Sequence, residues 1–157
     1  MAENKTNVMR ILERAKVEYT PLFYTAPEGF SDGLQIAEKL NLPPEFVYKT
    51  LVTRGGHDFF VFVIPILCEL DLKKAAKAVG QKSLDMIHVS EINKITGYVR
   101  GGCSPLGMKK AFVTVFDTSA KELEYIYVSA GKIGAQIKVN PHDLLRLSNA
   151  KFEEVVR

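Results

Sequence analysis

The stretch FVYKTLVTRGGHDFFVFVIPI, residues 46–66, determines the fold class. Two runs rich in β-branched and aromatic residues flank GGHD at 55–58, and this pattern predicts a β-hairpin. Lys49 interrupts the first run, on the strand face that it shares with Val47 and Leu51. A lysine on an apolar face must reach solvent, pair with a carboxylate or line a pocket. The alternative is an edge-strand lysine that blocks aggregation.

Helix and strand patterns alternate on both sides of the hairpin. Helices are predicted at 7–15 with Asn4 or Thr6 as the N-cap, and at 34–40, 71–79, 91–96 and 141–147. Ser90 is the expected cap of the fourth helix, and Gly97 its end. Strands are predicted at 18–24, 111–117, 124–130, 135–139 and 151–156. Because the elements interleave without a strict βαβ rhythm, we expect a mixed α/β fold with a curved sheet or partial barrel.

Length and composition favour a single domain, residues 1–157. The hydrophobic share is 46%, the charged share 25% and the net charge +3, which disfavours a non-specific nucleic-acid binder. No apolar run approaches the roughly 20 residues of a membrane helix, and the polar N-terminus does not resemble a signal peptide. Two cysteines make neither a disulfide framework nor a zinc set, so we expect a cytoplasmic protein with reduced thiols.

A glycine-rich stretch, GYVRGGCSPLGMKK at 97–110, is the strongest candidate for a binding loop. Successive glycines let backbone N–H groups converge on one ligand oxygen. Such a nest suits a carbonyl oxygen that becomes negative during a reaction. The alternative is a plain turn between a helix and a strand.

Cys103, inside this loop, is a candidate nucleophile because it lies beside glycines and near Arg100. A small side chain packed beneath the loop is the favoured alternative, since most free cysteines are small buried hydrophobic residues. The three histidines, His57, His88 and His142, show no metal-ligand spacing, and we expect no metal and no cofactor. No dinucleotide or P-loop motif is present, which disfavours nucleotide-binding folds.

Four segments together resemble the YbaK family of free-standing aminoacyl-tRNA deacylases, which are related to the editing domain of prolyl-tRNA synthetases. The segments are AEKLNLPPEFVYKTL, DLKKAAKAVG, TGYVRGGCSPLGMKK and YVSAGKIGAQIKVNPHDLLRL, in order along nearly the whole chain. The resemblance implies a β-barrel-like sheet surrounded by helices. It also implies deacylation of mischarged tRNA, with cysteine on tRNA(Pro) or tRNA(Cys) as the acyl group.

The resemblance also implies the site residues. Lys49 matches the essential lysine of the family, and Gly101 and Gly102 match its paired glycines; these three are the expected catalytic residues. The expected substrate-binding residues are Tyr24 (after a one-residue shift), Phe30, Thr50, Ser104, Pro105, Gly107, Ser129, Gly131 and Asp143. One departure is TAPEG at 25–29, where many relatives carry histidine and aspartate. It affects the expected selectivity more than the expected reaction.

The implied partners are the 3′ acceptor end of an aminoacyl-tRNA and prolyl-tRNA synthetase, with neither DNA nor a membrane. In the family, the thiol of the substrate's own cysteine attacks its carbonyl, so the enzyme need only position it. Three alternatives stay open: editing of Ala-tRNA(Pro), a hydrolase that uses Cys103 as its nucleophile, and a non-catalytic module that binds tRNA or a synthetase.

Overall fold

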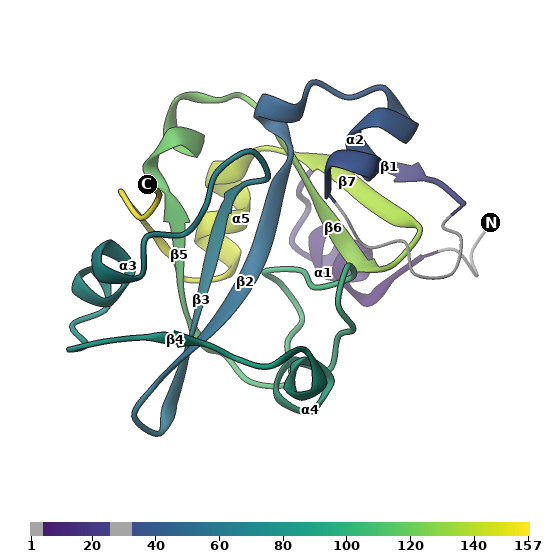
Figure 1. Ribbon diagram of the computed structural model, residues 1–157. Coiled ribbons are helices and arrows are strands. Elements are labelled where there is room, and N and C mark those ends of the chain that lie inside the picture. Colours follow the sequence, from purple (N-terminus) through teal and green to yellow (C-terminus); the bar gives the residue numbers. More distant parts are fainter. Residues whose placement is uncertain (1–4, 26–32) are drawn as a thin grey trace.

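The computed structural model describes residues 5–25 and 33–157, and in these ranges strands and helices alternate along the chain (Figure 1). The strands are β1 Tyr19–Phe23, β2 Tyr48–Gly55, β3 Asp58–Pro65, β4 Asp85–Met86, β5 Val113–Asp117, β6 Ile126–Lys132, β7 Ala135–Val139 and β8 Lys151–Glu153. The α-helices are α1 Asn7–Arg14, α2 Gly33–Leu40, α3 Leu72–Ala78, α4 Ile92–Thr96 and α5 Pro141–Leu147. Short 3₁₀ helices are η2 Pro44–Phe46, η3 Val89–Glu91 and η4 Thr118–Glu122. The predicted mixed α/β class is confirmed.

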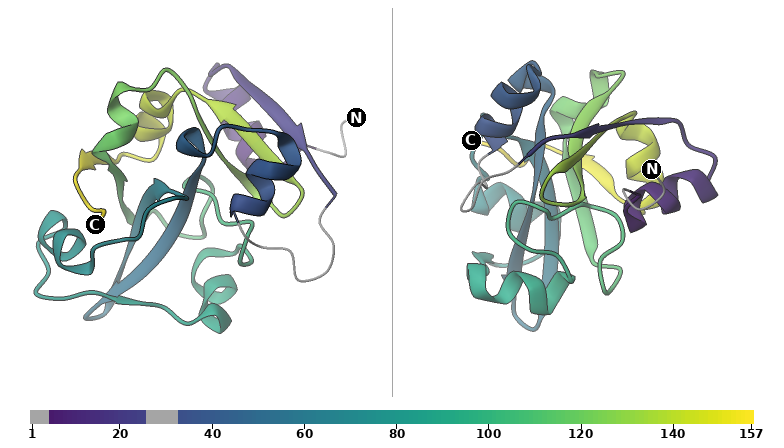
Figure 2. Two further views of the ribbon diagram at one scale, coloured as in Figure 1. Left: turned by 45° about the horizontal axis from the view of Figure 1, so that its top comes forward. Right: turned by 90° about the vertical axis from the view of Figure 1, so that its right-hand side faces the viewer.

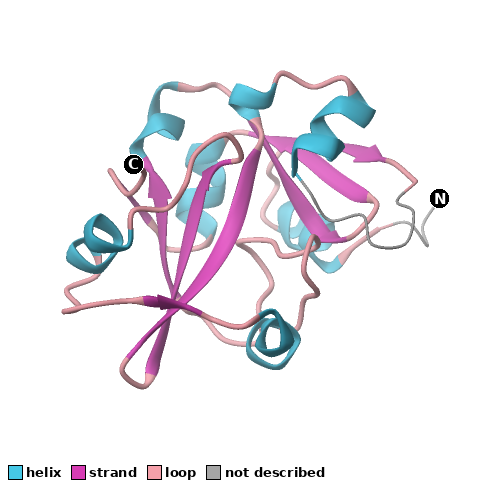
Figure 3. Cartoon of the chain, viewed as in Figure 1, coloured by secondary structure: helices cyan, strands magenta, loops and turns pink. Residues whose placement is uncertain are grey.

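The strands form two sheets. One is antiparallel with the order β1-β7-β6, and the other has the order β4-β2-β3-β5-β8, in which β5 is parallel to both of its neighbours. The sheets meet where Val47 bridges Tyr127 in parallel, and β2 and β6 then diverge (Figure 1). The described strands therefore do not close into a barrel. The part of the expectation that holds is an open, curved arrangement with helices on its outside (Figure 3).

The predicted hairpin is the centre of the larger sheet. β2 and β3 are joined by Gly56 and His57, and Gly56 takes a φ of +62°, which suits glycine in a two-residue turn. Lys49 lies opposite Ile64, so the two side chains share a face. Thr50 lies opposite Val63 on the other face. Both β3 residues are fully buried, which places the hairpin between two layers of core.

Helices α1 and α5 cover one side of the smaller sheet (Figure 2). The α1 residues Val8, Met9 and Leu12 are buried in a core cluster that also contains Leu144 of α5. Thr6 caps α1 by accepting from the Met9 N–H at 3.2 Å, which confirms one of the two predicted caps. In the same way Asp71 caps α3 and Asn140 caps α5.

The expected start of the fourth helix was wrong. Ser90 is not its cap: the segment begins one turn earlier as η3, with His88 as N-cap. The Glu91 carboxylate accepts from the His88 N–H at 3.1 Å and also pairs with the Arg54 guanidinium of β2. This second, long-range partner fixes the carboxylate and with it the start of the segment. Gly97 ends α4 with a φ of +88°, as predicted.

None of the helices in the described ranges has the length and apolar character that crossing a membrane requires.

Asp117 holds the C-terminal segment to the sheet, and we expect Asp117→Ala to lower the free energy of unfolding by about 1–3 kcal/mol. Its carboxylate is buried and accepts from the N–H groups of Val155 and Ser119, both at 3.1 Å. Removing it leaves two donors without an acceptor. Urea denaturation measures the change. The exposed Asp58→Ala is the matched control and should stay within about 0.5 kcal/mol of the wild type.

Candidate active site

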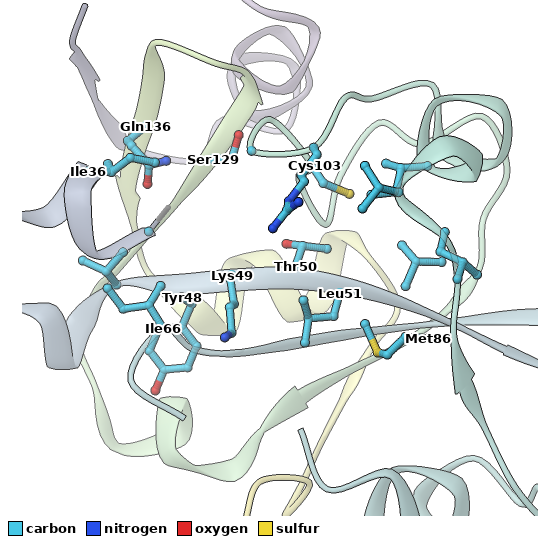
Figure 4. Close-up of a pocket in the computed structure, with 18 residues that line it drawn as sticks. Ile36, Tyr48, Lys49, Thr50, Leu51, Ile66, Met86, Cys103, Ser129 and Gln136 are labelled. Carbon is cyan, nitrogen blue, oxygen red and sulfur yellow. The ribbon is translucent and has the colours of Figure 1, made fainter. Parts of the chain in front are cut away.

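A cavity of about 460 Å³ lies between the diverging strands β2 and β6, which is within the usual size of small-ligand pockets (Figure 4). Helix α2 borders it at one end, and β4, η3 and α4 border it at the other. The described lining residues are Gly33, Ile36, Val47, Tyr48, Lys49, Thr50, Leu51, Val52, Ile66, Met86, Ile87, Val89, Ile92, Arg100, Gly101, Cys103, Ser129 and Gln136. The cavity thus combines an apolar lining with a few polar groups.

Two cations line this cavity. Lys49 is half-buried, and no hydrogen bond or ion pair is found for its side chain within residues 5–25 and 33–157. Arg100 is exposed at the same cavity. The described lining contains no carboxylate that would neutralise either cation. The positive charge is therefore available to an anionic ligand.

The glycine-rich loop reaches the cavity through Gly101. The Gly102 N–H donates to the Val99 carbonyl at 2.9 Å, and Gly101 has a φ of +87°, as is typical of the third residue in a type II turn. The expected nest of two donors is therefore reduced, because Gly102 uses its N–H inside the turn. The Gly101 N–H takes no part in that turn, and Gly101 lines the cavity.

Gly102 has a structural task at this position. A Cβ on it would lie 3.0–3.1 Å from the backbone of Lys132 and Ile133, which is tighter than an ordinary contact, so glycine lets the loop rest closely on the β6–β7 turn. This contact brings the loop to the far end of the gap between β2 and β6. Gly102 therefore positions the loop and does not itself line the cavity.

Four other matched residues shape the loop and its seat but do not line the cavity. Ser104 and Pro105 are buried beneath the loop. Gly107 and Gly131 both have positive φ and both lie against the ring of Tyr98. The Tyr98 hydroxyl donates to the Leu106 carbonyl, and burial raises the Tyr98 pKa to about 12. These residues form a packed support behind the cavity.

Two further expected residues, Tyr24 and Asp143, are absent from the described cavity lining. Asp143 lies in another depression, beside Tyr19 and Tyr125, and pairs with Arg146 at 3.2 Å. Tyr24 continues the β1–β7 ladder, where its N–H donates to the Gly134 carbonyl at 2.9 Å. Phe30 lies outside the described residues. Of the expected residues, Lys49, Thr50, Gly101 and Ser129 are brought together at the cavity.

Gln136 is a cavity residue that the sequence analysis missed. It lies opposite Ser129 on β7, is only 3% exposed, and its Oε1 finds no partner among the described residues (Figure 4). A buried carboxamide oxygen without a partner is costly unless a ligand or water satisfies it. In the strand AQIKV glutamine stands between two apolar residues, but these point to the opposite face and do not show that the glutamine is buried.

Cys103 lines the cavity, but its environment does not favour a nucleophile. Burial raises the pKa of its thiol to about 12, against an ordinary value near 8.5. The thiolate is the reactive form, and at neutral pH it is almost absent. The packed, unreactive interpretation of Cys103 is therefore the one that the structure favours.

No group of three or more histidine, cysteine, aspartate or glutamate side chains is placed to hold a metal ion within the described part of the chain.

Comparison with known proteins gives consistent similarities. Residues 31–147 match the family described as the aminoacyl-tRNA editing domain. The chain is 44% identical over 154 residues to EbsC of Enterococcus faecalis, a proposed Cys-tRNA(Pro)/Cys-tRNA(Cys) deacylase, covering 98% of this chain and 94% of that one. It is 29% identical to the proline–tRNA ligase of Thermosipho africanus over 68% of this chain and 20% of the ligase.

The fold has relatives among solved structures. A crystal structure described as a proposed trans-editing enzyme for prolyl-tRNA synthetase superposes with a TM-score of 0.80 at 21% identity, covering 97% of this chain and 98% of that one. At this level of identity the similarity concerns the fold.

We expect Cys103 in a Cys68→Ala background to react slowly with iodoacetamide. With a pKa raised to about 12, the thiolate fraction and the rate should rise about tenfold per pH unit between pH 8 and 10. In urea the same thiol should react faster at pH 8 and level off above its ordinary pKa of about 8.5. A rate for the folded protein that levels off near pH 8.5 would contradict the burial argument.

Proposed function

The chain belongs to the aminoacyl-tRNA editing domain family, and from this we propose that it is a trans-editing deacylase that removes cysteine from mischarged Cys-tRNA(Pro). Cys-tRNA(Cys) is the second substrate suggested by the name of its 44% identical relative. The resemblance to the YbaK group drawn from the sequence is confirmed. Such an enzyme is needed because similar amino acids differ by only a few kcal/mol in synthetase binding, so that a second sieve is required.

The observation that carries the proposal is the cavity between β2 and β6. Lys49, Arg100 and Gly101 all line it, with no carboxylate among the described lining residues. A tRNA 3′ end offers a phosphate for the cations and an ester carbonyl for the N–H donor. Lys49 would hold the terminal phosphate or ribose, as a compact charge on a flexible stem does well.

We propose that the substrate's thiol is the nucleophile. Its sulfur attacks the ester carbonyl, the bond to the ribose oxygen breaks, and the thiol proton ends on the ribose hydroxyl. The products are free tRNA and a cyclic thiolactone, which water opens to cysteine. The Gly101 N–H would stabilise the carbonyl oxygen as it becomes negative. The buried, protonated Cys103 fits a mechanism that needs no protein nucleophile.

The remaining parts of the proposal concern the setting of the reaction. Residues 1–157 act as one editing domain on the 3′ end of tRNA. Prolyl-tRNA synthetase is the partner that supplies recognition of the tRNA body. The cytoplasm is the compartment where this substrate arises. Tyr24, Phe30 and Asp143 remain proposed substrate contacts on the family resemblance alone.

Deacylation of Cys-tRNA(Pro), Ala-tRNA(Pro) and Ser-tRNA(Pro) is the direct test. We expect fast loss of cysteine and little loss of alanine or serine, because alanine has no nucleophile and serine has a much weaker one. Release of labelled amino acid over time measures all three. Fast loss of alanine would move the enzyme to another editing specificity, and tRNA binding without any turnover would favour a non-catalytic module.

We expect Lys49→Met to lower kcat/KM for Cys-tRNA(Pro) by about 10- to 100-fold. This corresponds to the loss of a charge-assisted hydrogen bond worth about 1.5–3 kcal/mol. Methionine keeps the length and apolar stem of lysine, so the fold should be preserved, as thermal unfolding will report. Lys77→Met on α3, which lies away from the cavity lining, is the matched control and should keep full activity. Full activity of Lys49→Met would refute the assigned role.

A further inference from the structure

The cavity lies against the edge of β2, and not against one of its faces. All six consecutive residues from Val47 to Val52 line it. Neighbouring side chains in a strand point to opposite faces, so only an open edge can present six residues in succession. In Figure 4 the cavity runs along β2, with Thr50 on one side of the strand and Leu51 on the other.

The hydrogen-bond register shows which main-chain groups point into the cavity. The Ile66 N–H donates to the Val47 carbonyl at 2.9 Å, so Val47, Lys49 and Leu51 direct their main-chain groups toward β3. The alternate residues direct theirs to the other edge. This is confirmed at Val52, whose carbonyl accepts from the Ile87 N–H at 3.4 Å.

Thr50 is the β2 residue whose main-chain N–H and C=O are both left without a main-chain partner in the described part of the chain. On one side of it, Val52 bonds to the segment after β4; on the other, Val47 bridges Tyr127 of β6. Between these two points, no main-chain bond outside the β2–β3 ladder involves Thr50 in the described ranges. Both its N–H and its C=O therefore face the cavity.

We propose that the aminoacyl group of the substrate binds the main chain of Thr50 as a strand one residue long; this rests on the proposed function. An aminoacyl ester carries an α-ammonium donor and a carbonyl acceptor on the same carbon. Thr50 offers the complementary acceptor and donor. Two such residues can exchange both bonds, as in a hydrogen-bonded antiparallel pair, which is the smallest case of strand addition to a sheet edge.

This pairing fixes the direction of the substrate. The Thr50 N–H is nearer to Lys49, so the ester carbonyl and the attached ribose lie toward Lys49. The α-ammonium then lies toward Leu51. None of the described lining residues carries a carboxylate that would bind it instead. The Thr50 N–H becomes a second donor to the carbonyl oxygen, in addition to that of Gly101.

An amide-to-ester replacement between Lys49 and Thr50 tests the proposal, because it removes the Thr50 N–H and keeps every side chain. The probe is 3′-amino-3′-deoxyadenosine acylated with serine, an amide analogue that resists cleavage, and calorimetry measures its binding. We expect binding to weaken about tenfold, which equals 1.4 kcal/mol. Thermal stability should fall no more than in the matched control, since this N–H lies outside the β3 ladder and only the weaker ester carbonyl of Lys49 acts within it.

The matched control is the same replacement between Leu22 and Phe23. There the Tyr24 N–H bond to Gly134 fixes the register, so the Phe23 N–H also faces an open edge, but outside the cavity lining. This control should bind the probe like the wild type. Thr50→Val, which keeps the N–H and removes the hydroxyl, should weaken binding by less than about threefold.

Three results would overturn the proposal. These are wild-type affinity of the Lys49–Thr50 ester for the probe, unfolding of that variant, and a Thr50 amide resonance that does not shift when the probe saturates the protein. The readouts need no turnover. If the wild type binds the probe through Thr50 but does not deacylate Cys-tRNA(Pro), the proposed function fails while this binding mode stands.

Discussion

The contact on which the site depends is the parallel bridge between Val47 and Tyr127, the point where the two sheets touch. Main-chain pairing brings β2 and β6 together there, and the two strands then diverge into separate sheets (Figure 1). Had the pairing continued, β2 would have no free edge and the space now lined by Thr50 and Ser129 would be filled by backbone. The cavity is thus a consequence of strand pairing that stops early.

The far end of that gap is held open by a different kind of contact. The loop before β5 rests on the β6–β7 turn through Gly102, where a side chain would make an unusually tight contact with the backbone. At the other side of the cavity, the Arg54–Glu91 ion pair joins β2 to the segment that begins α4. Both contacts join parts of the chain that are far apart in sequence, and together they hold the walls at a fixed separation.

Local patterns predicted much of this fold. The hairpin followed from GGHD between two apolar runs, and the Thr6 cap followed from a side chain that bonds within its own turn. The start of the fourth helix was missed because Glu91 takes a partner 37 residues away. The parallel pairing of β5 with β3 and β8 was missed for the same reason. Interactions at long sequence separation leave no periodic signal.

The residues of the candidate site also fall into two groups: those that local sequence patterns predicted and those that depend on the folded geometry. Lys49 and Gly101 were found from anomalies in composition, but the commitment of the Gly102 N–H to Val99 depends on a turn geometry that residue types alone do not fix. Gln136 was missed because burial of a polar side chain is visible only after the sheets are placed.

The open edge of β2 has a consequence for how this family can change over generations. Main-chain N–H and C=O groups are the same for every residue type except proline. Substitutions among the residues that line the cavity therefore leave such a binding surface in place. With the aminoacyl group held by Thr50 as proposed, changes at wall positions such as Gln136 or Ile36 would alter the acyl preference and leave the main-chain contacts in place.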